Sequence, residues 1–260
     1  MSSEHWGRRP REWAELAEPS NAVLFERVLD AVGCGPGTAL LDVGCGSGYA
    51  LAMAARRGAT VTGLDITPEL LEIAQERVPA ATLLVGGMDT LPFADESFDV
   101  VVGFNAFPFA DDPPAAVTEA ARVVRRGGLV AATTFAEPQR NESTALHLAL
   151  EPLRAAGPAA AQHLPYALSE PSGLRQLLQS GGLMPVTDGE VPVVWAHDDV
   201  DRAVRAVLAS GGGAMAIDAA GEPAARAALT TAVIPFTAAD GRVAMHNLFR
   251  YAVARRPDRP

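Results

Sequence analysis

Three glycines, Gly44, Gly46 and Gly48, stand at every second position in "LLDVGCGSGYA" (residues 40–50), directly after an apolar run. An apolar run that ends in glycines is typical of a buried strand followed by a tight turn into a helix. Loops of this kind bind dinucleotides, phosphates and other nucleotide-like cofactors. The loop therefore constrains the fold strongly but leaves the ligand open.

Short apolar runs alternate with amphipathic stretches from residue 39 to residue 135, which is typical of strand–helix–strand units on a parallel sheet. Strands are expected at residues 39–44, 60–65, 82–87, 98–105 and 128–135, and helices after Gly48, over residues 68–77 and over about residues 114–125. Thr67 is expected to cap the helix that begins at Pro68, and "RRGG" (residues 125–128) is expected to end the third helix. We interpret "DDPP" (residues 111–114) as a turn and helix cap.

The alternation of apolar runs and amphipathic stretches is less regular after residue 135. It predicts helical pieces over residues 136–183, a strand at residues 184–197, a helical region over about residues 198–233 interrupted at "SGGG" (residues 210–213), and a last strand at residues 242–256. The order of elements predicts a doubly wound, Rossmann-like α/β fold whose C-terminal half carries helical insertions that cover the active site.

The composition excludes some classes of binding partner. A formal net charge of −10 argues against nucleic acid as a partner, because such binding depends on clustered Lys and Arg. The apolar runs are too short to span a bilayer, and the N-terminus lacks the apolar core of a secretory signal, so we expect a cytoplasmic protein with no membrane partner. Cys34 and Cys45 are expected to be reduced thiols, and the Cys and His spacing matches no metal motif.

The glycine loop does not match the dinucleotide fingerprint G-x-G-x-x-G, since the third glycine would fall on Tyr49 or Leu51. No G-K-[ST] is present for a triphosphate loop either. Asp65 ends the next apolar strand, where an acid is placed to accept hydrogen bonds from both hydroxyls of a ribose. The alternative is that Asp65 is a plain helix cap, but Thr67 suits that position better. The ligand is therefore expected to carry a ribose.

Residues 38–135 contain "LLDVGCGSG", "VTGLD", "LPFADESFDVVVGFNAF" and "EAARVVRRGGLVAATTF". With these motifs the chain resembles the class I S-adenosylmethionine-dependent methyltransferases of the small-molecule type. The resemblance implies a mostly parallel seven-stranded sheet, S-adenosyl-L-methionine as cofactor and S-adenosyl-L-homocysteine as product. It also implies that residues 1–37 form an N-terminal helical cover, residues 38–135 bind the cofactor, and residues 136–260 complete the sheet and cover the substrate.

The resemblance also assigns residues to the cofactor. The loop residues expected against its methionine part are Gly44, Cys45, Gly46 and Gly48. Asp65 would hold the ribose, and Ile66 would pack on the adenine. In the family an Asp shortly before Leu-Pro-Phe meets the adenine amino group, but "GGMD" places Gly87 there. We expect Asp89 or the backbone of Met88 to take over that contact.

Further residues are expected around the reacting end of the cofactor. Asn105 follows the fourth strand, at the carboxyl edge where open α/β sheets bind ligands, and is expected near the sulfonium. Phe107 and Phe109 are expected on the wall of the substrate pocket. Trp13 lies in an N-terminal stretch that, in similar proteins, folds over the cofactor; Trp6 shares that stretch.

The catalytic residue is left open by the sequence. Holding a nucleophile in line with the S–CH₃ bond can supply on the order of 7–11 kcal/mol of the barrier without an acid or a base. If the acceptor is a hydroxyl, a base would help, and His5 and His163 are the candidates because they fall in segments expected to cover the pocket. No metal is needed for this step. The acceptor molecule and the oligomeric state are not predicted.

Three hypotheses for the function remain. The first is methyl transfer to an O, N or C atom of a small metabolite, with secondary metabolism as one setting. The second is a cofactor-binding protein of the same fold that no longer transfers methyl, or that catalyses another reaction such as a cyclisation. The third is an NAD-dependent oxidoreductase.

Overall fold

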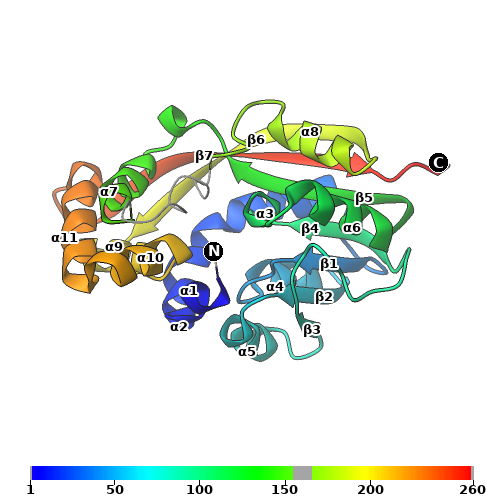
Figure 1. Ribbon diagram of the computed structural model, residues 1–260, viewed down its shortest axis with the longest axis horizontal. Helices are drawn as coiled ribbons and strands as arrows, with labels where there is room; N and C mark the ends of the chain where they lie inside the picture. Colours follow the sequence, from blue (N-terminus) through cyan, green and yellow to red (C-terminus); the bar gives the residue numbers. More distant parts are fainter. Residues whose placement is uncertain (1, 155–165, 259–260) are drawn as a thin grey trace.

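A seven-stranded sheet runs through the described residues in the order β3-β2-β1-β4-β5-β7-β6 (Figure 1). The computed structural model describes residues 2–154 and 166–258. The strands are β1 (Ala39–Val43), β2 (Thr60–Asp65), β3 (Thr82–Val85), β4 (Phe98–Gly103), β5 (Val124–Phe135), β6 (Met184–His197) and β7 (Val243–Arg255). β1 to β5 pair in parallel, whereas β7 runs antiparallel to β5 and β6. The expected doubly wound, mostly parallel fold is confirmed.

Helices cover both faces of the sheet, as two apolar cores require. α3 (Ala22–Ala31) and α4 (Tyr49–Arg56) pack with alternate strand residues into one core, and α6 (Pro113–Val123) and α8 (Gly173–Ser180) pack into the other. α5 (Pro68–Arg77) follows β2 over the range expected from the sequence. Its first turn begins at Pro68, which is suited to that position because proline has no backbone N–H to leave unpaired.

A separate group of helices lies at the end of the molecule where β6 finishes and β7 begins (Figure 1). α7 (Thr144–Arg154), α9 (Val200–Leu208), α10 (Gly211–Ala220) and α11 (Glu222–Val233) pack around a third apolar core with Val243 and Met245 of β7. "SGGG" does interrupt the helical region, since Ser210 is the N-cap of α10. Short 3-10 helices are η3 (Phe107–Phe109), η4 (Pro138–Arg140) and η6 (Ile234–Phe236).

The N-terminal segment lies between this helical group and α5 (Figure 1). It consists of α1 (Ser3–Gly7), α2 (Pro10–Glu12), the π-helix η1 (Trp13–Ala17) and the 3-10 helix η2 (Glu18–Asn21). Ion pairs connect it to both sides: Arg11 to Glu76 of α5, and Arg9 to Glu222 of α11. The segment is thereby held over the carboxyl end of the sheet.

Two local predictions were wrong. "RRGG" does not end a helix, because α6 stops at Val123 and these residues belong to β5, where Gly127 and Gly128 exchange backbone hydrogen bonds with Arg256. Thr67 occupies the N-cap position of α5, but among the described residues its hydroxyl makes no capping hydrogen bond. The interpretation of "DDPP" is confirmed, since Asp112 caps α6 by accepting from the Ala115 amide at 3.0 Å.

Of the helices that the structure describes, none has both the length and the apolar character that a membrane crossing requires. Within the same residues there is no group of three or more His, Cys, Asp or Glu side chains arranged to hold a metal ion. Cys34 and Cys45 are both buried free thiols.

Candidate functional site

The glycine loop leaves β1 in a left-handed backbone conformation at each glycine, with φ of +73°, +54° and +75° at Gly44, Gly46 and Gly48. A Cβ at Gly44 would lie 2.7 Å from Ala106 Cβ, and one at Gly48 would lie 2.8 Å from Ala74 Cβ. The chain's own packing therefore requires glycine at these two positions. At Gly46 the nearest atom is instead a carboxylate oxygen of Glu18, at 2.7 Å.

Asp65 ends β2 beside this loop and is buried. Its Oδ2 accepts a hydrogen bond from the Gly46 amide, and its Oδ1 accepts one from the Thr67 amide, both at 2.9 Å. Asp65 therefore holds the start of α5 and also lies at the glycine loop. Each of its carboxylate oxygens keeps a second lone pair for a ligand. Burial raises the pKa of Asp65, and the amides of Gly46 and Thr67 oppose that rise. Ile66 is exposed next to it, where an apolar ligand face would cover it.

Asp89 and Met88 lie on the neighbouring loop after β3. Asp89 Oδ1 is enclosed and has no hydrogen-bond partner among the described residues. A buried acceptor without a partner is costly, so its presence favours a ligand that donates a hydrogen bond there. The Met88 methyl lies 3.9 Å from the position of a Cβ at Gly44, which brings this loop against the glycine loop.

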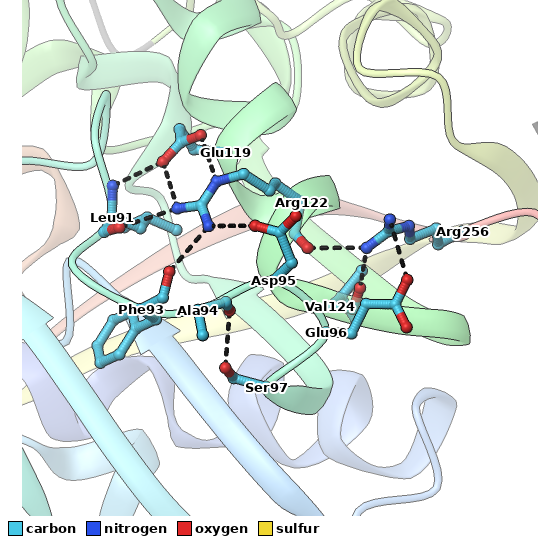
Figure 2. Close-up of polar contacts among 10 residues, drawn as sticks. All are labelled: Leu91, Phe93, Ala94, Asp95, Glu96, Ser97, Glu119, Arg122, Val124 and Arg256. Atoms are coloured by element: carbon cyan, nitrogen blue, oxygen red, sulfur yellow. Dashed lines mark hydrogen bonds and ion pairs between the residues drawn. The ribbon is translucent and has the colours of Figure 1, made fainter.

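Arg122 of α6 fixes the loop that follows Asp89 (Figure 2). Its guanidinium donates to the carbonyls of Leu91 and Phe93 at 2.9 and 2.8 Å and to Asp95 Oδ1 at 2.8 Å. Glu119 completes the arrangement by accepting from both Arg122 and the Leu91 amide. A planar guanidinium that satisfies several acceptors at once positions this loop without occupying the site.

Glu18 of the N-terminal segment is the site residue that the sequence did not indicate. It is buried; its Oε1 accepts from the Ser47 amide at 3.0 Å, and its Oε2 accepts from the Ser47 hydroxyl and from Arg77 Nη1, the latter at 2.9 Å. Burial raises the pKa of Glu18, while Ser47 and Arg77 oppose that rise. No motif marks a single Glu so far before the loop; the only signal was its place in a segment expected to cover the site.

The two N-terminal tryptophans pack against each other, and Trp13 lies beside the glycine loop. Trp13 Nε1 is 3.8 Å from the position of a Cβ at Gly46, so this ring reaches the loop. Trp6 packs edge-on against Trp13, with ring centroids 4.9 Å apart. Trp13 is thus brought to the site, and Trp6 supports it.

Asp42 at the end of β1 is almost fully buried, with Oδ1 lacking a hydrogen-bond partner in the described part of the chain. Burial raises the pKa of Asp42 well above its ordinary value, and the negative charges of Glu18 and Asp65 raise it further. Cys45 is enclosed beside these groups, and burial likewise raises the pKa of its thiol. A cationic ligand with hydrogen-bond donors suits this set of acceptors.

Asn105 follows β4 with φ of +51°, an uncommon value for a residue other than glycine. Its amide donates to Thr133 Oγ1 at 2.8 Å, and that hydroxyl donates to Asn105 Oδ1 at 3.0 Å. The strained backbone and the fixed side chain hold Asn105 at the carboxyl edge of the sheet, as expected. Strain of this kind is frequent at functional sites.

Phe107 and Phe109 do not share one environment. Phe107 is fully buried against Gly103 of β4, where a Cβ would lie 2.5 Å from its ring. The expectation that it lines the pocket is therefore corrected: Phe107 belongs to the core between the sheet and α6. Phe109 is half-buried and stays a candidate for the pocket wall.

No histidine within the described residues is hydrogen-bonded to the glycine loop. His5 Nδ1 is 2.8 Å from the Ser2 hydroxyl and its Nε2 is 3.3 Å from Asp218 of α10, so its ring is engaged away from the glycines. His163 lies outside the described residues. His147 of α7, which the sequence did not single out, has an enclosed Nε2 without a hydrogen-bond partner among the described residues, and burial lowers its pKa to about 4.

The residues fit S-adenosylmethionine. Asp65 can take the ribose hydroxyls, Asp89 the adenine amino group, Ile66 the adenine face, and the loop backbone the methionine part. Asp42 and Asp89 each offer an enclosed oxygen that lacks a partner within the described residues, and the excess of carboxylates suits a cation.

Comparison with known proteins finds methyltransferases. Residues 41–132 match the family model described as a methyltransferase domain. An uncharacterized protein of Mycobacterium tuberculosis is 41% identical over 123 residues, which are 46% of this chain and 45% of that protein. Malonyl-[acyl-carrier protein] O-methyltransferase of Serratia marcescens is 38% identical over 111 residues, which are 43% of this chain and 44% of that protein. The chain thus matches about half the length of these curated relatives.

A solved structure extends the likeness to the whole fold. The crystal structure of a putative methyltransferase from Bacillus halodurans aligns with a TM-score of 0.61 at 16% identity, covering 90% of this chain and 98% of that one. At 16% identity, this similarity shows that the two chains share a fold. Residues 41–132 are thus a methyltransferase domain by their match, and the chain as a whole shares the fold of that putative methyltransferase.

Proposed function

We propose that the chain transfers the methyl group of S-adenosylmethionine to an O, N or C atom of a small metabolite. The observation that carries the proposal is the arrangement at the glycine loop, where Asp65 bonds to Gly46 while Asp42 and Asp89 each present an enclosed oxygen with no partner in the described residues. The Serratia marcescens relative is an O-methyltransferase by its name, which supports an oxygen acceptor here. The net charge of −10 makes nucleic acid an unfavourable acceptor.

In this proposal the three parts of the chain have separate roles. Residues 1–37 cover the cofactor, residues 38–135 bind it, and residues 136–260 complete the sheet and enclose the acceptor. S-adenosylmethionine supplies an electrophilic methyl group on a positively charged sulfur. The protein binds it through Asp65, Asp89 and the loop from Gly44 to Gly48, and excludes water with the N-terminal segment.

In this proposal, residues that follow the carboxyl end of β4 hold the acceptor molecule in position. Asn105, whose side chain Thr133 fixes, and half-buried Phe109 are the residues assigned to this side. Positioning alone can supply on the order of 7–11 kcal/mol of the barrier. His5 is engaged by Ser2 and Asp218, so a base at neutral pH would have to come from elsewhere, and His163 remains a candidate on sequence grounds.

Calorimetry followed by turnover tests the proposal. S-adenosylmethionine and S-adenosylhomocysteine are titrated into the protein, with NAD as the competing hypothesis. Binding of NAD without binding of the sulfonium compound would contradict the proposal. Formation of S-adenosylhomocysteine is then followed with sets of small phenols, amines and carboxylic acids, and a product heavier by one methylene unit confirms transfer. Cofactor binding without turnover on any set favours the hypothesis of a protein that binds the cofactor for another purpose.

A further inference from the structure

The loop after β3, residues 86–93, carries Asp89 and is hydrogen-bonded at its two ends. At its start, the Gly86 amide donates to the Asp65 carbonyl at 3.0 Å. Between the two ends, no backbone hydrogen bond among the described residues involves positions 87–90. Asp89 Oδ1 has no partner in that part of the chain either. The position of Asp89 is therefore set by the groups that fix the two ends of this loop.

Glu119 and Arg122 of α6 fix the far end (Figure 2). Glu119 Oε2 accepts from the Leu91 amide at 2.9 Å. Arg122 donates to the Leu91 carbonyl at 2.9 Å and to the Phe93 carbonyl at 2.8 Å. Hydrogen bonding to Glu119 raises the pKa of Arg122, and hydrogen bonding to Arg122 lowers the pKa of Glu119, so both groups stay charged at neutral pH. The pair thus fixes three backbone groups shortly after Asp89.

Apolar packing also holds this end of the loop but does not orient its peptide groups. Leu91 is buried, and the ring of Phe93 packs edge-on against Phe98 with centroids 5.1 Å apart. Hydrogen bonds are directional, so those of Arg122 set the orientation of the Leu91 and Phe93 carbonyls. Asp89 is two residues before Leu91, at most about 7 Å along the chain. A turn of the Leu91 peptide therefore displaces the Asp89 carboxylate.

The adenine amino group donates hydrogen bonds, whereas an ionised carboxylate only accepts them. A site prefers adenine to a base without that amino group only if the carboxylate oxygen lies at hydrogen-bond distance from it. We propose that the Arg122–Glu119 pair gives the cofactor site its selectivity for the adenine amino group, acting through the position of Asp89. Both are positioning residues, because their hydrogen bonds go to the loop and to each other. The proposal rests on the proposed function, in which Asp89 accepts from the adenine.

Calorimetry on the full chain tests this with two ligands that need no acceptor molecule. They are S-adenosylhomocysteine and its analogue with hydrogen in place of the adenine amino group. The wild-type protein is expected to prefer S-adenosylhomocysteine. In Arg122→Met, which keeps an unbranched apolar side chain and loses every donor, this preference is expected to fall about tenfold, as for the loss of one hydrogen bond. Affinity for the analogue is expected to change little, because it makes no bond to Asp89.

Arg256→Met is the matched control, because Arg256 bonds to the same stretch of α6 and β5 from the other side (Figure 2). Its Nη1 donates to the carbonyls of Arg122 and Val124 at 2.7 and 2.6 Å, and its Nη2 lies 3.4 Å from Glu96 Oε1. None of these partners belongs to residues 86–93. Arg256→Met is therefore expected to lower the unfolding free energy and to keep the wild-type ratio of dissociation constants.

A double variant tests whether Arg122 acts through Asp89. In Asp89→Ala the carboxylate is absent, so its position no longer matters. Adding Arg122→Met to Asp89→Ala is expected to leave the ratio of the two dissociation constants unchanged, although the same substitution lowers the preference in the wild-type background. Such a difference between the two backgrounds measures the coupling of the two residues.

The outcomes separate this proposal from the proposed function. If Arg122→Met weakens both ligands equally, or if Arg256→Met shifts the ratio as much as Arg122→Met does, the effect is one of stability and the positioning role is overturned. Equal affinity of the wild-type protein for the two ligands overturns it as well, while the proposed function stands. If the wild-type protein binds neither S-adenosylhomocysteine nor S-adenosylmethionine, the proposed function fails. Should Arg122→Met not fold, Arg122→Lys decides, because it keeps the positive charge beside Glu119 and loses the planar set of donors.

Discussion

Asp65 and Gly46 are joined by a hydrogen bond of 2.9 Å from the Gly46 amide to Asp65 Oδ2. The bond ties the end of β2 to the loop that follows β1, two strands that are neighbours in the sheet. The side chain proposed to hold the ribose is therefore also a support of the loop on which the cofactor would lie. Binding and loop conformation are coupled through this single carboxylate.

Asp65→Ala is expected to weaken binding of S-adenosylmethionine at least a hundredfold, because the hydrogen bonds to the ribose are lost and the loop loses its support. The variant is also expected to lose about 1–3 kcal/mol of unfolding free energy, since the amides of Gly46 and Thr67 lose their acceptor. Calorimetry and urea denaturation measure the two effects. Asp112→Ala is the control, because Asp112 caps α6 and should lower stability without changing affinity. Unchanged affinity in Asp65→Ala would remove Asp65 from the site.

Gly46→Val is expected to abolish cofactor binding and to lower the melting temperature. The backbone at Gly46 has φ of +54°, which costs a residue with a side chain about 1–2 kcal/mol, and the new Cβ would meet Glu18 Oε1. The backbone strain and the contact with Glu18 are the reasons for the expected loss of stability. Gly87→Ala is the control, because no atom lies within 4 Å of its Cβ position and its φ is not positive. Wild-type affinity in Gly46→Val would contradict the placement of the loop.

The sequence predicted those features that depend on local pattern. α5 and β6 have the predicted bounds, because proline begins the helix and an alternating run makes the strand. Features set by contacts far apart in the sequence were missed. "RRGG" joined β5 because of its pairing with Arg256, more than 120 residues away, and Phe107 turned inward because Gly103 leaves room for its ring.

The same limit applies to the site. The glycine loop and Asp65 were predictable because both follow apolar strands at a known spacing. Glu18 was not, because its partners Ser47 and Arg77 are 29 and 59 residues away. Asp89 was predicted only through the family pattern, and its enclosed oxygen is a property of the folded chain.

Asp89→Ala is expected to leave the unfolding free energy unchanged or slightly raised, because Asp89 Oδ1 has no partner to lose in the described residues. Affinity for S-adenosylmethionine is expected to fall about tenfold or more, since a hydrogen bond from the adenine amino group is lost. The comparison ligand is S-inosylhomocysteine, which carries a carbonyl acceptor in place of that amino group. It should bind the variant at least as tightly as the wild type, because the carbonyl and the Asp89 carboxylate are both acceptors. A variant that binds S-adenosylhomocysteine as tightly as the wild type would assign the adenine contact to the Met88 backbone instead.

The lowered pKa of His147 is expected to make the stability of the folded chain depend on pH. Burial lowers its pKa from 6.5 to about 4, so between these values the unfolded chain binds a proton that the folded chain does not. Stability from this group is complete above pH 6.5 and is lost as the pH falls toward 4, by about 3 kcal/mol in total. His147→Phe should remove this part of the profile, because a phenyl ring can keep the edge-on contacts with Phe135 and Tyr166 without titrating. Urea denaturation from pH 4 to pH 8 measures the difference between the two proteins. Parallel profiles for wild type and His147→Phe would show that His147 is protonated as readily in the folded chain as in the unfolded one.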